Sequence, residues 1–268
     1  MRRLAFVAAL ATAVAALGGF PEAGDFTRRP VRALYLGDSL SDFDRGSNHV
    51  DRLQTKLDAF SPRCVSIYNY AVRGDYIERM MERFRGGTNC TARAAYHGIW
   101  GRQYDWAFVS LGHNDTRAWS ETEFSRPEMS EGQLRSGFGE LIALLKSKGI
   151  GRIILVSATS SNFEFTSRKA AMLQAAMSAG KASKRRVVRY GDPKFLEAYN
   201  SLLADFAKQP GVEYLDIYTA MKALPDKASL VRPTDGVHLT EKGHAYVAER
   251  EYEYLVRVAR LHQTTKEQ

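Results

Sequence analysis

The chain has 268 residues, of which 44% are hydrophobic and 25% are charged, so it can bury a substantial core and suits one α/β domain. Its formal net charge of +8 favours anionic polysaccharide, cell-wall polymer or a membrane surface, and by itself does not exclude nucleic acid. The two cysteines have no nearby pair of histidines, which argues against a zinc site, and we expect no metal.

The first residues have the pattern of a secretory signal peptide. Arg2 and Arg3 precede an apolar stretch from Leu4 to Leu17, and Ala16 and Gly18 have the spacing of a cleavage site. The stretch is shorter than the roughly 20 apolar residues that span a membrane, which favours cleavage over an anchor. We therefore expect a signal peptide at 1–18, a single domain at 19–268, and a secreted or periplasmic protein without stable membrane insertion.

Cys64 and Cys90 are the only cysteines of the chain. In an exported protein such a pair is more often one disulfide than two free thiols, so we expect the two residues to be bonded. The bond would close a loop around the helix expected near 75–85 and add roughly 3 kcal/mol in the chain-entropy model.

Five apolar runs rich in β-branched residues predict buried strands, and helical patterns lie between them. The strands are expected at Val31 to Leu36, Val65 to Tyr70, Trp106 to Leu111, Ile153 to Ser157 and Val212 to Ile217. The helices are expected at Val50 to Phe60, Asp75 to Phe84, Gln133 to Lys148, Lys194 to Lys208 and Glu241 to Leu261. Alternating β and α units predict a three-layer α/β/α sandwich around a five-stranded, mainly parallel sheet. Gly149 is expected to follow the end of the third helix, and Thr240 to cap the last one.

Two insertions depart from this alternation, at 116–130 and 158–192. The second contains an amphipathic piece around Arg168 to Ser178. Ligands of open parallel sheets bind outside the carboxyl ends of the strands, so we interpret the insertions as loops or lids that shape a pocket, with a merely decorative excursion as the alternative. The densest basic run, at 184–186 with Arg189, lacks interleaved aromatic residues, which favours a solvated helix end over a nucleic-acid site.

Ser39 lies in the Gly-Asp-Ser-Leu-Ser sequence at 37–41, just past the first expected strand. A sharp turn from strand to helix there can expose the hydroxyl and direct N–H groups at the start of the helix toward a reacting oxygen. Taken alone the sequence is a common turn. It also lacks the Gly-x-Ser-x-Gly elbow of the α/β-hydrolases, so a serine enzyme of this kind belongs to another class.

Asp235 and His238 form a second signal near the C-terminus, in Asp-Gly-Val-His at 235–238. Residues three apart in a tight turn can bring a carboxylate onto one ring nitrogen and leave the other nitrogen facing the edge of the sheet. Such a carboxylate fixes the tautomer of a general base and stabilises its imidazolium form. Taken alone, the pattern is most often a turn with a surface histidine.

Gly74 and Asn114 supply a third signal, because each follows another apolar run. With the Ser39 N–H, the Gly74 N–H and the Asn114 side-chain amide would give three donors for a tetrahedral oxyanion. Individually, Gly74 can be a turn residue and Asn114 a helix cap.

Together these four segments, in this order, resemble the SGNH hydrolases, also called GDSL esterases and lipases. The blocks are 37–41, Gly74, Gly-His-Asn-Asp at 112–115, and 235–238, and the resemblance spans about Val31 to Leu261. It implies a flavodoxin-like sandwich and a hydrolase without metal or cofactor, with Ser39, His238 and Asp235 as triad and Ser39, Gly74 and Asn114 as oxyanion hole.

We therefore expect a serine esterase that hydrolyses carboxylic esters, with O-acetyl groups on carbohydrate as the favoured substrate. A lipase or lysophospholipase for longer acyl chains, or an O-acyltransferase to a sugar hydroxyl, is the alternative, and a non-catalytic carbohydrate-binding protein is disfavoured by the complete motif set. We expect a small-molecule or polysaccharide partner and no nucleic acid.

Residues beside the motifs have weaker signals. Asp38 and Asp115 are expected to hold their turns through hydrogen bonds. His113 occupies a variable position of its motif, where a contact with substrate and a position without any function are the two alternatives. Phe43, Tyr76 and Trp119 either form the floor of a sugar or acyl site or simply pack.

Overall fold

Five parallel strands form the central sheet. The computed structural model describes residues 30–87, 96–180 and 186–257. The strands pair in the order β2-β1-β3-β5-β7, and every neighbouring pair is parallel. Their bounds are β1 (Val31–Gly37), β2 (Val65–Asn69), β3 (Trp106–Ser110), β5 (Arg152–Val156) and β7 (Val212–Leu215). All five expected strands and the flavodoxin-like order are confirmed, and the carboxyl ends of the strands meet at one edge.

Strand β1 illustrates why continuous apolar runs form these strands. Leu34 and Leu36 pack into the hydrophobic cluster on one face of the sheet, whereas Ala33 and Tyr35 pack into the cluster on the other. Successive side chains of a strand point to opposite faces, so a strand covered on both faces needs apolar residues at every position.

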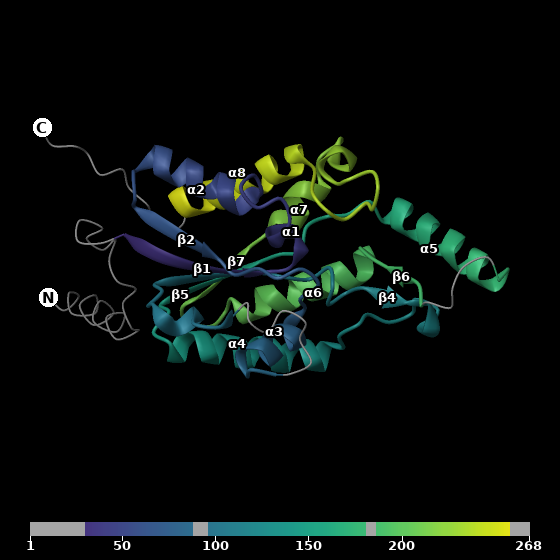
Figure 1. Ribbon diagram of the computed structural model, residues 1–268, viewed down its shortest axis with the longest axis horizontal. Helices are drawn as coiled ribbons and strands as arrows, with labels where there is room; N and C mark the ends of the chain where they lie inside the picture. Colours follow the sequence, from purple (N-terminus) through teal and green to yellow (C-terminus); the bar gives the residue numbers. More distant parts are fainter. Residues whose placement is uncertain (1–29, 88–95, 181–185, 258–268) are drawn as a thin grey trace, which may run out of the picture.

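Helices cover both faces of this sheet (Figure 1). One layer contains α2 (His49–Phe60), α7 (Ile217–Lys222) and α8 (Glu241–Arg257). The other contains α3 (Ile77–Phe84), α4 (Glu131–Ser147) and α6 (Pro193–Phe206). The expected three-layer sandwich is therefore confirmed.

Capping groups set the ends of these helices. A capping box between Ser130 and Gln133 starts α4, and Gly149, with φ of +79°, follows its end as expected. Thr240 Oγ1 accepts the Gly243 N–H at 3.1 Å, so Thr240 caps α8, also as expected. Helix α3 begins at Ile77, later than expected. There the Ile77 N–H donates to Asp115 Oδ1 at 2.8 Å. The last expected turn of α8, at 258–261, lies outside the described residues.

The two insertions are joined to each other by a second small sheet. In the first, β4 (Ala118–Trp119) pairs antiparallel with β6 (Val188–Arg189) of the second. The second insertion also forms α5 (Phe163–Ser178), which includes the expected amphipathic piece and projects beyond the sandwich (Figure 1). We call α5, β4 and β6 the arm. Strands of two residues are too short to leave an alternating pattern in the sequence, which is why this sheet was not expected.

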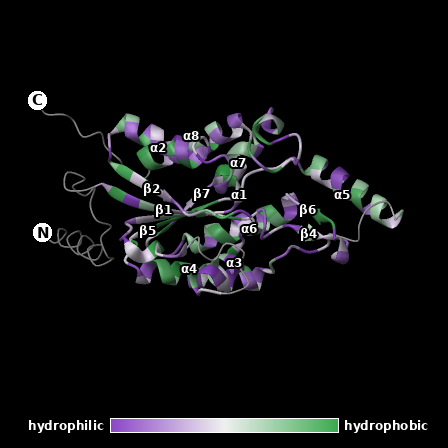
Figure 2. Cartoon of the chain, in the orientation of Figure 1, coloured by the Kyte–Doolittle hydropathy of each residue, from purple (hydrophilic) through white to green (hydrophobic). Residues whose placement is uncertain are grey.

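The arm is the part of the described structure where large hydrophobic side chains reach solvent. Met172 is 74% exposed and Leu173 is 45% exposed, and both lie on α5. Figure 2 shows that hydrophobic and polar residues alternate along this helix. The basic run partly belongs to the arm as well: Arg186 stacks on Trp119 with 4.0 Å from its guanidinium carbon to the ring centroid, and Arg189 pairs with Asp192 at 3.0 Å.

Two further expectations fall wholly or partly on residues outside the described ranges. The signal peptide at 1–18 lies there, and so does Cys90. Cys64 is bonded to no described cysteine, and its Sγ donates to the Leu57 carbonyl oxygen at 3.8 Å. Because Cys90 is not described, the disulfide stays a prediction. In the described ranges, no helix has both the length and the apolar character needed to cross a membrane.

Candidate active site

Ser39 is the first residue of the short helix α1 (Ser39–Asp42), directly after β1. Asp38 is its N-cap, and Asp38 Oδ1 accepts the Leu40 N–H at 2.9 Å. The expected sharp turn from strand to helix is thus present, and Asp38 holds it as expected. Ser39 itself is 9% exposed, so its hydroxyl has little freedom to leave this position.

Asp235 and His238 lie in a turn that a small hairpin closes. Val231 and Leu239 form an antiparallel bridge at its base, and the Arg232 N–H donates to the His238 carbonyl at 2.6 Å. Within the turn, Asp235 Oδ1 accepts the N–H groups of Val237 and His238, each at 2.8 Å. These backbone bonds alone therefore orient the carboxylate of Asp235, independently of any contact with another side chain.

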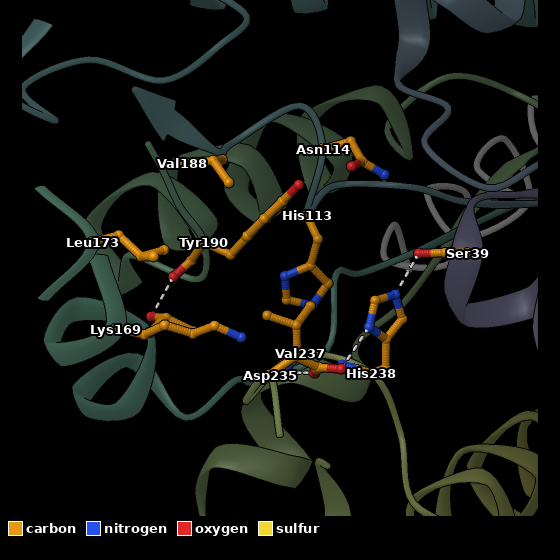
Figure 3. Close-up of a pocket in the computed structure, with 11 residues that line it drawn as sticks. Ser39, His113, Asn114, Lys169, Leu173, Val188, Tyr190, Asp235, Val237 and His238 are labelled. Atoms are coloured by element: carbon orange, nitrogen blue, oxygen red, sulfur yellow. Dashed lines mark hydrogen bonds and ion pairs between the residues drawn. The ribbon is translucent and has the colours of Figure 1, made fainter. Parts of the chain in front are cut away.

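The three polar groups meet at the edge of the sheet. Ser39 Oγ lies 2.8 Å from His238 Nε2, and His238 Nδ1 lies 3.0 Å from Asp235 Oδ2 (Figure 3). Burial raises the pKa of Asp235, but hydrogen bonds from the turn and the ring outweigh it and leave the pKa below its usual value. The Phe43 ring packs against His238, with centroids 5.0 Å apart, so this aromatic residue supports the histidine. An ionised carboxylate, an oriented imidazole and a hydroxyl in this order can activate the hydroxyl as a nucleophile.

Asn114 is brought to the same edge by the loop after β3. Its Nδ2 donates to the Asp75 carbonyl at 3.1 Å and, at a longer 3.3 Å, to Asp38 Oδ2, next to Ser39. The loop needs Gly112, whose φ is +136°, because a Cβ there would stand 2.6 Å from the Ala158 Cβ. The amide of Asn114 thus lies beside the helix start that carries Ser39.

Gly74 lies in the turn after β2, with φ of +77°. The Arg73 N–H donates to Asp42 Oδ2 at 3.0 Å, so this turn lies beside α1. Asp75, the next residue, forms a fully buried ion pair with Arg83 at 2.7 Å. The segments that contain Gly74, Asn114 and Ser39 therefore adjoin one another.

Two further carboxyls are buried under the site. Burial raises the pKa of Asp38 to about 7 and, in the same way, the pKa of Asp115 to about 7. Asp115 Oδ1 bonds the Ile77 N–H, and the Asp115 carbonyl accepts the Met129 N–H at 3.0 Å. The expectation that Asp115 holds its loop is confirmed, and its contacts connect three segments beneath the site.

A cavity of about 180 Å³ opens beside Ser39. The sandwich contributes the expected Ser39, Asn114, Asp235 and His238, together with His113 and Val237, whereas the expected Gly74 is not one of the described residues that line the cavity. The arm contributes one wall, made by Thr166, Lys169, Leu173 and Val188, and Tyr190, which follows β6, continues that wall (Figure 3). The expectation that the second insertion shapes a pocket is confirmed. The individual arm residues were missed, because nothing in the helical pattern of α5 marks which face meets the cavity.

His113 lines this cavity although it is only 3% exposed. Its Nε2 lies 2.9 Å from Thr159 Oγ1, and burial lowers its pKa to about 4, so the ring is neutral. Tyr76 and Trp119 instead pack under Arg117, whose guanidinium carbon is 5.3 and 5.0 Å from their ring centroids. Those two aromatic faces are occupied by a cation of the protein itself.

The described parts of the chain contain no group of three or more histidine, cysteine or carboxylate side chains placed to hold a metal ion. The expectations of no metal and no cofactor stay predictions.

Comparisons with known proteins identify the family and the fold of the chain. Residues 35–246 match the model of the GDSL-like lipase/acylhydrolase family. A search of curated proteins found no match. Among solved structures, the fold is similar to that of a lipase/acylhydrolase from Enterococcus faecalis (TM-score 0.56, 15% identity, covering 88% of this chain and 99% of that one). It is also similar to that of an acetyl xylan esterase (0.58, 14%, 84% and 100%) and of a psychrotrophic esterase from Pseudoalteromonas sp. (0.54, 14%, 86% and 99%). The chain therefore belongs to the GDSL-like lipase/acylhydrolase family, as its resemblance to the GDSL esterases and lipases implied, and is a serine hydrolase of ester bonds.

Proposed function

We propose that Ser39 is the nucleophile of this hydrolase, His238 its general base and Asp235 the carboxylate that orients the base. The observation that carries the assignment is the continuous pair of contacts from Ser39 Oγ to His238 Nε2 at 2.8 Å and from His238 Nδ1 to Asp235 Oδ2 at 3.0 Å. Asp235 keeps the proton on Nδ1, which leaves the Nε2 lone pair for the serine proton.

The oxyanion hole consists of the N–H groups of Ser39 and Gly74 and the Nδ2 amide of Asn114. The Asp75 carbonyl orients the amide of Asn114 through one N–H, and the other N–H exchanges its longer bond of 3.3 Å to Asp38 Oδ2 for the oxyanion. Removing one such donor typically costs roughly a hundredfold to a thousandfold in rate.

The reaction then takes two steps. Ser39 Oγ attacks the ester carbonyl as His238 takes its proton, and the tetrahedral oxyanion collapses to an acyl-enzyme when His238 gives that proton to the leaving alcohol. Water enters, His238 deprotonates it, and the same oxyanion hole stabilises the second tetrahedral intermediate. Carboxylic acid leaves, and the enzyme returns to its starting state.

The favoured substrate is an O-acetyl ester on carbohydrate, met outside the cytoplasm after removal of the signal peptide at 1–18. A cavity of about 180 Å³ suits a short acyl group, and the fold likeness to an acetyl xylan esterase is consistent with this substrate. A lipase or lysophospholipase is the second candidate. Its support is the apolar part of the cavity wall, at Leu173, Val188 and Val237, together with the exposure of Met172 beside it.

One experiment tests the assignment and separates the two substrates. Wild type, Ser39→Ala and Ser41→Ala are assayed with p-nitrophenyl esters from acetate to long chains, and for acetate release from acetylated polysaccharides. Ser41 is the matched control, because it lies in the same motif but is buried against His49, at 3.3 Å from Nε2. We expect Ser39→Ala alone to lose about 10⁴-fold or more of kcat. Preference for acetyl and release of polymer acetate support the carbohydrate esterase, whereas preference for long chains supports the lipase. Full activity of Ser39→Ala would refute the triad.

A further inference from the structure

We propose that Lys169 recognises an anionic group, a carboxylate or a phosphate, on the ester substrate. The inference rests on the proposed function, because it assigns a specificity to the cavity in which Ser39 is the proposed nucleophile. Lys169 belongs to α5 of the arm, and it lines that cavity together with Ser39 and His238. Its side chain runs along the wall, and the ammonium lies on the side of Val237 and His238 (Figure 3).

The ammonium of Lys169 is held in place by the turn that carries Asp235. Its Nζ donates to the Thr234 carbonyl oxygen at 2.9 Å, one residue before Asp235. An ammonium has three N–H donors, and this neutral partner uses one of them. The Phe165 ring, whose centroid lies 5.8 Å from Nζ, is neutral as well, so neither partner carries an opposite charge. The position of Lys169 is therefore tied to the proposed catalytic residues.

No carboxylate of the described ranges forms an ion pair with Lys169. Several other lysines do have one: Lys56, Lys208 and Lys222 each contact a carboxylate at 2.6 to 2.7 Å, and Lys242 contacts Asp226. In the described lining of the cavity, the carboxylate is that of Asp235, and its oxygens already accept the Val237 and His238 N–H groups and face the His238 ring. The cavity thus presents a positive charge that the protein leaves for a ligand.

Contacts between α5 and the turn keep this charge at a fixed distance from the reacting groups. The Asn162 N–H donates to the Gly236 carbonyl at 2.8 Å. At Gly236 a Cβ would stand 3.0 Å from Phe165 Cδ1 and 3.2 Å from the Asn162 carbonyl oxygen, so the helix and the turn pack closely. An anion bound to Lys169 would consequently lie at a fixed distance from an ester bond at Ser39.

A charge-assisted hydrogen bond of this kind contributes roughly 1.5 to 3 kcal/mol, which corresponds to about tenfold to a hundredfold in binding. Because the bond forms with the substrate as well as with the transition state, we expect the effect mainly in KM.

The test uses matched pairs of esters that differ only in charge. The first pair is an O-acetylated methyl glucuronoside and the corresponding O-acetylated methyl glucoside, and the second is a 1-acylglycerol 3-phosphate and the corresponding 1-acylglycerol. The enzymes are wild type, Lys169→Met and Lys169→Arg. Arg168→Met is the matched control, since Arg168 is the neighbouring residue on α5, is exposed, and lies 3.8 Å from Glu164.

We expect wild type to prefer the anionic member of one pair by about tenfold in kcat/KM. Lys169→Met should abolish that preference through KM, whereas Lys169→Arg and Arg168→Met should retain it. The pair that shows the preference identifies the anion as a uronate or a lipid phosphate. Equal turnover of both members of both pairs by wild type would overturn the proposal, as would an equal loss of preference in Lys169→Met and Arg168→Met. If none of these esters and no p-nitrophenyl ester is hydrolysed in a Ser39-dependent way, the proposed function itself fails, so the two failures are distinguishable.

Discussion

The start of α1 and the arm are the two sides of one cavity, and they are built in opposite ways. Ser39 and Ser41 are buried, and the Ser41 carbonyl alone accepts hydrogen bonds from Asn48 and Asn69 at 2.9 and 2.8 Å. The arm is attached by two-residue strands, and Leu173 in its cavity wall is 45% exposed. Reacting groups need a fixed geometry, which the sandwich supplies through many internal bonds. Substrate contacts are supplied by a surface element, as is usual for recognition loops on a rigid scaffold.

The largest effect should come from the rigid side. Asp235→Asn leaves the turn its size but favours the wrong tautomer of His238, so we expect kcat to fall by about 10⁴-fold with little change in KM. Steady-state kinetics with p-nitrophenyl acetate measure this, with the exposed Asp58→Asn as control. A loss of less than tenfold in Asp235→Asn would mean that the carboxylate does not orient the base.

Asn114→Ala should have the next largest effect. It removes the proposed oxyanion donor, and we expect kcat to drop by about a hundredfold to a thousandfold while KM stays nearly constant. The same kinetic assay checks it. A change confined to KM would show that Asn114 binds the ground state, and its role would then be substrate recognition, like that of the arm.

The junction between the two sides can be tested at Gly236. Gly236 has φ of +74°, and a Cβ at this position would lie 3.0 Å from Phe165 Cδ1, so Gly236→Ala should push the turn away from α5. We expect a stability loss of about 2 kcal/mol and a fall of about tenfold in kcat/KM. Gly180→Ala is the matched control, because Gly180 has φ of +69° at the end of α5 and no atom within 4 Å of its Cβ position. Thermal unfolding and kinetics that are equal for the two variants would show that close packing of α5 on the turn is unimportant.

A smaller effect is expected on the stability of the sandwich, at the buried pair of Tyr35 and Glu251. Tyr35 OH donates to Glu251 Oε1 at 2.6 Å, and burial raises the pKa of Glu251 to about 8. A carboxyl whose pKa is higher in the folded state stabilises the fold at low pH and loses that contribution as the pH rises through the folded pKa. Between pH 6.5 and 8, burial also keeps His49 neutral, with a pKa of about 3, so it does not titrate there.

In this window we therefore expect the Tm of wild type to fall as the pH rises. Glu251→Gln, which has no proton to lose, should reduce that fall by about 5 °C. Differential scanning calorimetry at both pH values measures it. An identical pH dependence of the two proteins would contradict the assigned protonation of Glu251.

The rigid side was largely predictable from the sequence, and the arm was not. Ser39, Gly74 and Asn114 each follow an apolar run, and parallel strands bring such positions to one edge. The start of α3 was misplaced because its capping partner, Asp115, lies far away in the chain and leaves no local signal. Lys169 was missed for a similar reason: its partner, the Thr234 carbonyl, is a backbone group 65 residues away.

Covalent labelling of Ser39 tests its assignment as the nucleophile most directly. Wild type and Ser39→Ala are treated with diethyl p-nitrophenyl phosphate, and the intact mass and the modified peptide are determined by mass spectrometry. We expect one diethylphosphoryl adduct on Ser39 of wild type, with loss of esterase activity in step with labelling, and no adduct on Ser39→Ala. An inactivated wild type whose adduct lies on another residue, or an adduct retained in Ser39→Ala, would contradict this assignment.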